Sequence, residues 1–172
     1  MTANARFGGL SATTMSAARQ KASILLRMLG ILWCAALSQP VWSSPVVTDT
    51  QTGIAIDGFD PVAYFTGDGA VQGREEFEFK FEGITWRFRS EGNRAAFADH
   101  PAVYAPQFGG YDPVAIGRGV SVPGHPLTWA IVGDRLYLFY DSKARADFIE
   151  APRRAISAAD RQWPEVRRQL PN

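Results

Sequence analysis

Two aspartates stand in the same short motif and are the strongest candidates for chemistry in the chain. Asp60 and Asp112 each follow a glycine and an aromatic residue and precede proline, valine and alanine, over residues 58–63 and 110–115. Aspartate before proline favours the start of a helix, because the carboxylate caps free N–H groups and proline fits the first helical position. Six residues are too few to indicate duplicated domains, so we interpret the repeat as one local solution used twice.

Asp112 allows two interpretations that are compatible with each other. It predicts a helix cap, and its remaining lone pairs predict an oxygen ligand that would favour a hard cation. His125 follows in a proline-rich stretch where we expect no regular structure, and a histidine there can bind metal, move protons or simply be exposed. We take Asp60, Tyr111, Asp112 and His125 as the candidate ligand-binding residues.

The sequence contains no recognised catalytic or metal-binding signature. One aspartate and one histidine do not make a metal site, and their spacing matches no known metal motif. There is no nucleophile elbow, no phosphate-binding loop and no dinucleotide fingerprint. We therefore predict no cofactor, with a divalent metal ion as the alternative, and we favour a protein without catalytic activity.

Residues 76–90 predict a β-hairpin, because apolar and polar side chains alternate along them. A two-residue turn at Glu82 and Gly83 would place all the apolar side chains of the segment on one face. The expected cross-strand pairs are Phe81 with Ile84, Phe79 with Trp86, and Phe77 with Phe88.

A second hairpin and three helices complete the expected elements. Residues 128–132 and 135–140 predict two strands around a Gly133-Asp134 turn, for which glycine in the first position favours type II′. Ser90 predicts the cap of a helix that ends at His100 and Pro101. The expected starts of the other two helices are Ser142, for a helix through Phe148, and Ser157 with Asp160.

Together these elements predict an α+β domain. We expect a small antiparallel sheet built from the two hairpins, with short helices packed on it.

Short runs along residues 54–164 match one protein family in order and spacing. They are residues 58–65, 81–83, 86–88, 90, 93–94, 97, 101, 104–107, 109–111, 123–124, 129, 136–138 and 163–164. In these runs the chain resembles the YHS-domain family, and more closely its exported subgroup, the YHS domain-containing (seleno)proteins.

The departures from the family matter as much as the match. Members of the subgroup commonly carry cysteine or selenocysteine directly after a Gly-Gly-Tyr motif, where this chain has Asp112. Other YHS domains carry cysteine after the aromatic residue of the second hairpin strand, where this chain has Arg89. The resemblance therefore implies a fold more than a reaction, and a thiol-based metal or redox role cannot operate here in that form.

The front of the chain predicts an export signal. Residues 1–44 contain four basic residues and no acidic one, and residues 28–37 form an uncharged apolar run. This run is too short to cross a bilayer, which takes about 20 apolar residues. A basic start, a short apolar run and the small residues Ser43 and Ser44 are typical of a cleavable signal peptide, with an uncleaved anchor as the alternative.

The predicted organisation is a signal peptide over 1–44, a flexible lead-in over 45–53 and a YHS-like domain over 54–172. We expect an exported protein, periplasmic or secreted. Cys34 is the only cysteine, so cleavage would leave a chain without thiols.

The charge of the exported chain excludes some classes of partner. Removing the four basic residues of the first segment from the total of 18 leaves 14 against 17 acidic residues. We expect an acidic domain to bind nucleic acids and anionic membranes poorly, because a protein that binds either needs clustered positive charge on its surface. We interpret the arginines of the C-terminal end, at positions 153, 154, 161, 167 and 168, as a solvated helix face.

These observations predict an exported YHS-like binding or accessory module of unknown ligand. Its partner would be a protein or a small molecule, with no nucleic acid and no stable membrane span after cleavage. The alternative is a metal-binding, redox or hydrolytic enzyme that uses carboxylates in place of the family's thiol.

Overall fold

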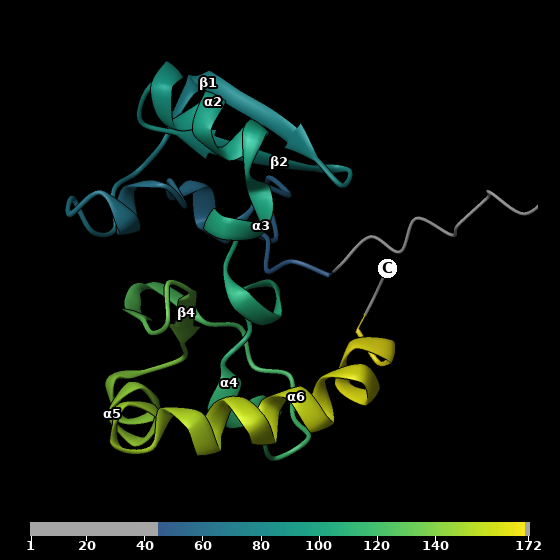
Figure 1. Ribbon diagram of the computed structural model, residues 1–172. Coiled ribbons are helices and arrows are strands. Elements are labelled where there is room, and N and C mark those ends of the chain that lie inside the picture. Colours follow the sequence, from purple (N-terminus) through teal and green to yellow (C-terminus); the bar gives the residue numbers. More distant parts are fainter. Residues whose placement is uncertain (1–44, 171–172) are drawn as a thin grey trace, which may run out of the picture. The chain divides into compact units, whose positions relative to one another are not determined.

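The computed structural model describes residues 45–170 (Figure 1). The predicted signal peptide over 1–44 lies outside the described residues, as do residues 171–172. Within the described part, no helix is both long and apolar enough to span a membrane.

The described chain folds as an α+β protein, as the sequence predicts. Its strands are β1 (Arg74–Phe81), β2 (Ile84–Phe88), β3 (His125–Ile131) and β4 (Leu136–Phe139). Its α-helices are α2 (Glu91–Asp99), α3 (Pro101–Tyr104), α4 (Pro113–Ile116), α5 (Ser142–Glu150) and α6 (Pro152–Arg168). Its 3-10 turns are η1 (Ile56–Gly58), η2 (Ala63–Phe65) and η3 (Gln107–Gly110). The two hairpins form separate two-stranded sheets, whereas we expected them to build one sheet.

The first hairpin confirms most of the expected register. Phe79 pairs with Trp86, Phe81 pairs with Ile84, and both turn residues have positive φ, as a type I′ turn requires. The third expected pair is wrong, because the register shifts between Arg74 and Glu78 and Phe88 lies opposite Arg74. The irregularity keeps the alternation of side chains between the two faces of β1, so Phe77 still packs against the core.

The second hairpin differs from the prediction in its turn and its start. Gly133 and Asp134 have φ of 58° and 55°, so the turn belongs to type I′ and not to type II′. Strand β3 begins at His125, which pairs with Phe139, so the expected irregular stretch at His125 is wrong. A two-stranded sheet has only edge strands, and an edge tolerates Pro126 at a break in the register.

The helix starts confirm one predicted cap and correct two others. Ser90 Oγ accepts from Asn93 N at 3.2 Å, as expected. The cap of α5 is Asp141, whose carboxylate accepts from Ala144 N at 2.8 Å, and Ser142 is already helical. Helix α6 starts at Pro152 and not near Ser157, because proline is well suited to the first helical position.

The structure repeats itself over far more than the six-residue motif. Each half runs through a 3-10 turn, a short helix led by Asp-Pro, a hairpin, a nine-residue helix and a proline-led helix. Matching left-handed residues lie in the first turns, with φ of 53° at Asp57 and 63° at Gly109. The order of these elements therefore repeats over most of the described chain, which the six-residue motif alone did not indicate.

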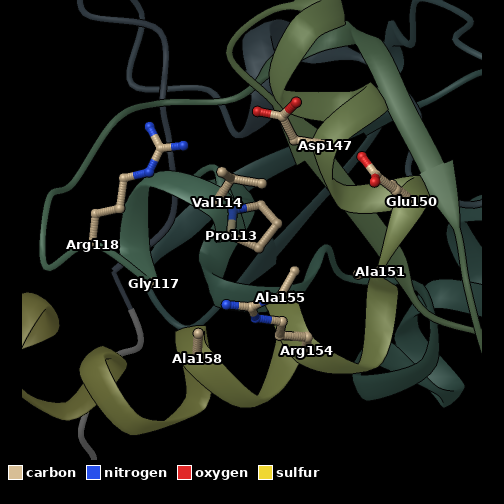
Figure 2. A pocket seen from close by; sticks show the side chains of 10 residues that line it. All are labelled: Pro113, Val114, Gly117, Arg118, Asp147, Glu150, Ala151, Arg154, Ala155 and Ala158. Atoms are coloured by element: carbon tan, nitrogen blue, oxygen red, sulfur yellow. The ribbon is translucent and has the colours of Figure 1, made fainter.

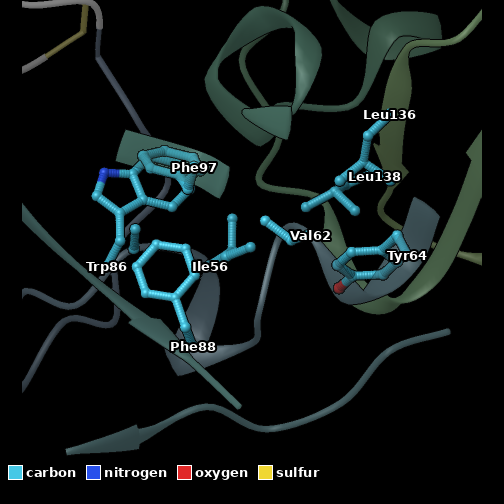
Figure 3. Close-up of a cluster of buried hydrophobic side chains, with 9 residues drawn as sticks. Ile56, Val62, Tyr64, Trp86, Phe88, Phe97, Leu136 and Leu138 are labelled. Atoms are coloured by element: carbon cyan, nitrogen blue, oxygen red, sulfur yellow. The ribbon is translucent and has the colours of Figure 1, made fainter. Parts of the chain in front are cut away.

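Strand β4 joins the two halves into one core. Its residues Leu136 and Leu138 belong to the apolar cluster of the first half, which Figure 3 shows around Trp86, Phe88 and Phe97. Tyr137 and Phe139 point the other way, into a cluster with Phe148 of α5. The strand is buried on both faces, so each half depends on it.

The segment that we expected to be a flexible lead-in is hydrogen-bonded to the domain. Val47 N donates to Gly109 O at 2.8 Å, and Ile56 N donates to Val47 O at 2.9 Å. A Cβ added at Gly109 would lie 1.9 Å from the Pro45 carbonyl oxygen, so only glycine allows this approach. Residues 45–47 therefore form part of the packed structure.

Tyr64 connects the start of the first half to the second hairpin. Its hydroxyl donates to Pro126 O at 3.0 Å, and its ring meets Trp129 edge to face at 5.2 Å. Burial, together with the nearby carboxylates of Asp60 and Asp57, raises the pKa of Tyr64. The folded protein therefore holds this phenol in its neutral form.

We expect Tyr64→Phe to lower the free energy of unfolding by about 1–3 kcal/mol at pH 8, because the buried Pro126 carbonyl loses this donor. A phenol whose pKa is raised by folding stabilises the protein below its unfolded pKa of about 10 and loses that contribution as the pH rises further. The variant should therefore lose less stability than wild type between pH 9 and 11. Urea unfolding across this range checks the point, and equal alkaline losses in both proteins would contradict it.

Candidate functional site

Asp60 is fully buried and lies at a junction of the first half. Its Oδ1 accepts from Val62 N at 2.8 Å and Ala63 N at 3.3 Å. Its Oδ2 accepts from Arg89 N at 2.8 Å and Asn93 Nδ2 at 2.6 Å. One carboxylate thus caps the short turn that follows it and holds the end of β2 and the start of α2.

Asp112 does the same in the second half. It is 2% exposed, and its Oδ1 accepts from Val114 N at 2.7 Å and Ala115 N at 3.3 Å. Its Oδ2 accepts from Tyr140 N, at the end of β4, at 3.0 Å. The predicted cap at α4 is confirmed, and the contact with β4 is an additional role that the sequence did not indicate.

The main-chain partners of both aspartates limit what these groups can do chemically. Each carboxylate is removed from solvent and accepts hydrogen bonds on both oxygens, mostly from backbone N–H groups. Arg89 offers its backbone N–H to Asp60, while its guanidinium pairs with Asp68. These groups hold helix starts onto strand ends, and each of the four carboxylate oxygens already accepts at least one hydrogen bond.

The other two candidate residues lie apart from these junctions. Tyr111 is half-buried, its ring centroid lies 6.1 Å from that of Trp163, and burial raises its pKa. His125 is exposed, and its Nδ1 accepts from Leu127 N at 3.1 Å. It lines a shallow pocket of about 320 Å³ with Asp49 and Asp57.

The four candidates therefore do not form one constellation. Asp112 and His125 line different pockets that share only the exposed Tyr140. Over residues 45–170, no three histidine, cysteine, aspartate or glutamate side chains are grouped so that they could hold a metal ion.

A pocket of the described chain lies between α4, α5 and α6 (Figure 2). Its volume is about 440 Å³. Pro113, Val114 and Ala155 provide an apolar lining, and Figure 2 shows Arg118 across the opening from Asp147 and Glu150. We call this pocket the α4–α6 groove; its lining residues are Pro113, Val114, Gly117, Arg118, Asp147, Glu150, Ala151, Arg154, Ala155 and Ala158.

The charges of the α4–α6 groove are only partly compensated within the protein. Asp147 pairs with Lys143 at 2.7 Å. Among the described residues, Arg118, Glu150 and Arg154 make no ion pair with one another or with a neighbour. The groove therefore offers charges of both signs above an apolar floor.

Sequence reasoning missed this groove because long-range packing creates it. Arg154 is exposed, as we expected of the C-terminal arginines, and it also lines the groove. Small residues allow the helices to approach, since a Cβ added at Gly117 of the α4 end would lie 3.1 Å from Ala158 Cβ of α6. The only sequence signal was the run of small residues along α6, and it does not show which helix packs on it.

The comparisons with known proteins identify no relative of this chain. No protein-family model, no curated protein and no solved structure matches it. The functional argument therefore rests on the geometry of the chain itself.

Proposed function

We propose that this protein is an exported, YHS-like binding or accessory module without catalytic activity, and that it holds its ligand in the α4–α6 groove. The observation that carries the proposal is the pair of uncompensated arginines, Arg118 and Arg154, facing Asp147 and Glu150 across an apolar floor. Ligand sites typically combine such a floor with a few placed polar groups.

Binding is favoured over catalysis by the state of the buried carboxylates. A general base or a metal ligand has to reach the substrate or the ion directly or through one water. Asp60 and Asp112 are 0% and 2% exposed and are hydrogen-bonded through both oxygens, which favours a structural role for each of them. The enzyme alternative depended on these carboxylates, whereas a binding module needs them only as structural supports.

The chemistry of the groove favours a small molecule that carries both an anionic and a cationic group. Arginine binds carboxylates through two parallel hydrogen bonds, and Arg118 and Arg154 are available for this contact. Glu150 offers an acceptor for an ammonium group at the opposite wall. A volume of about 440 Å³ suits a molecule of the size of an amino acid or a short peptide end.

Native mass spectrometry of protein purified from its own compartment tests this proposal. We expect a fraction of the protein to carry a small molecule, and Arg154→Glu to lower that fraction at least fivefold by reversing the charge at the wall. Arg153→Glu is the matched control, because Arg153 is its exposed neighbour on α6 and does not line the groove. A protein that carries no small molecule, or equal losses in both variants, would contradict the proposal.

Export is tested separately at the N-terminus. We expect the mature chain to begin between residues 43 and 48, because the basic start, the short apolar run and Ser43 and Ser44 precede that point. N-terminal sequencing of the secreted or periplasmic protein gives the cleavage site directly. Recovery of the intact chain embedded in a membrane would overturn the prediction of a cleaved signal.

A further inference from the structure

A second pocket adjoins the α4–α6 groove and shares part of its lining. Val114, Arg118 and Asp147 line both, and Figure 2 shows their side chains on one rim of the groove. The second pocket has a volume of about 240 Å³, and its apolar and aromatic lining consists of Val114, Ala115, Val122, Tyr140 and Ala144. We call it the Tyr140 pocket. A ligand held in the groove can therefore extend past Val114 into this pocket.

Tyr140 carries an exposed ring on a fixed backbone. Its backbone N donates to Asp112 Oδ2 at 3.0 Å, and the preceding Phe139 is fully buried. Tyr140 is nevertheless 63% exposed, and among residues 45–170 its side chain makes no hydrogen bond and no ring contact. An aromatic ring provides a large contact area and loses little conformational entropy on binding. The ring of Tyr140 is therefore available to a ligand in this pocket.

The charged groups of the Tyr140 pocket disfavour a second anionic group on the ligand. Of the two basic residues, Lys143 pairs with Asp147 at 2.7 Å, and Arg118 lies on the boundary with the groove. Asp112 and Asp141 accept from backbone N–H groups at the starts of α4 and α5. An anionic side chain in the pocket would lie near these two carboxylates and be repelled. The apolar and aromatic lining accordingly suits an uncharged side chain.

The distribution of these groups matches the geometry of an α-amino acid, in which the ammonium, the carboxylate and the side chain are attached to one carbon atom. Arg118 lines both pockets, so a carboxylate bound there places the α-carbon at their boundary. Glu150 lines only the groove and offers an acceptor to the ammonium. The side chain then enters the Tyr140 pocket. An apolar cavity of about 150 Å³ takes up benzene, so about 240 Å³ provides room for an aromatic side chain.

We propose that the ligand of the α4–α6 groove is a free α-amino acid with a large apolar side chain, and that this side chain binds in the Tyr140 pocket. The inference rests on the function proposed for the groove. It makes Tyr140 the residue that determines which side chain is preferred.

Alanine, phenylalanine and lysine are suitable probes, because they differ only in the side chain. Titration of ¹⁵N-labelled protein follows the backbone N–H resonances of Gly117, which lines the groove alone, and Ala144, which lines the Tyr140 pocket alone. We expect every probe to shift the Gly117 resonance, and phenylalanine to shift that of Ala144 as well. Phenylalanine should bind about tenfold more tightly than alanine, as partial burial of a phenyl ring predicts.

Tyr140→Ala removes the ring and keeps the backbone N–H group that binds Asp112. This variant should lower the affinity for phenylalanine about threefold to tenfold and leave the affinity for alanine unchanged. Leu127→Ala is the matched control, because Leu127 is 61% exposed on the same hairpin and lines neither pocket. Tyr140 also borders the shallow pocket at His125, so His125→Ala tests the other side of the ring and should leave the affinity for phenylalanine unchanged.

The outcomes separate this inference from the function proposed for the groove. Equal affinities for alanine and phenylalanine, with a response at Gly117, would overturn the inference and leave that function in place. Lysine carries the cationic side chain that Asp112 and Asp141 would attract, and tighter binding of lysine than of phenylalanine would also overturn it. Equal losses in His125→Ala and Tyr140→Ala would have the same result. If no probe shifts the Gly117 resonance, the inference is wrong, and native mass spectrometry tests the groove independently.

Discussion

Replacing Phe97 by alanine is expected to lower the free energy of unfolding by about 3–5 kcal/mol, as other buried phenylalanine truncations do. Phe97 is fully buried, and its ring lies between 4.9 and 6.4 Å from four other aromatic rings. These rings belong to Phe79, Phe81, Trp86 and Phe88. Loss of the central ring leaves a cavity that this rigid cluster cannot close.

Two variants serve as controls for the Phe97 prediction. Phe97→Leu keeps most of the volume and should cost less than about 2 kcal/mol. Phe148 is the matching residue of α5 and contacts Tyr137 and Phe139 at 4.9 and 5.0 Å, so Phe148→Ala should destabilise the protein comparably. Urea unfolding measures all three, and a loss below about 1 kcal/mol for Phe97→Ala would show that the ring is not central to packing.

Asp60→Ala is expected to be of similar severity, at about 3–5 kcal/mol, because it leaves several buried donors unpaired at once. The donors are Val62 N, Ala63 N, Arg89 N and the Asn93 side-chain amide. Asp99→Ala is a matched control, since Asp99 is exposed at the end of α2 and should change stability by no more than about 0.5 kcal/mol.

The Asp112→Asn variant distinguishes a side chain that only caps α4 from one that also holds the end of β4. If Asp112 only capped α4, Asp112→Asn would be nearly harmless, because asparagine caps about as well. Its Oδ2 also accepts from Tyr140 N, and an amide NH₂ placed there would face another donor. We therefore expect Asp112→Asn to cost about 1–3 kcal/mol in chemical denaturation, and wild-type stability in this variant would show that the contact with β4 contributes nothing.

The parts of the fold that could be predicted are those that local sequence determines. The alternation around Trp86 sets which side chains of the first hairpin share a face, and Ser90 and Asp112 act as caps through residues two or three positions away. Where two adjacent residues are both good caps, as at Asp141 and Ser142, local preference alone cannot choose between them. For this reason, the predicted cap of α5 was wrong by one residue.

The parts that could not be predicted depend on residues far apart in the chain. The second oxygen of Asp112 meets an N–H group 28 positions away, and that of Asp60 meets one 29 positions away. The hydrophobic periodicity of the sequence does not predict such contacts. It also does not show that β4 is covered on both faces. The α4–α6 groove was missed on the same grounds, because it exists only once α6 packs against α4.

The position of β4 has a consequence for how the molecule could be divided. Leu136 and Leu138 complete the core of the first half, so a fragment ending near Ala105 would lack two of its central side chains. Chains of about fifty residues form marginal cores even when complete. We therefore expect the first half to need β4, which lies 30 residues beyond its end, before its core is complete.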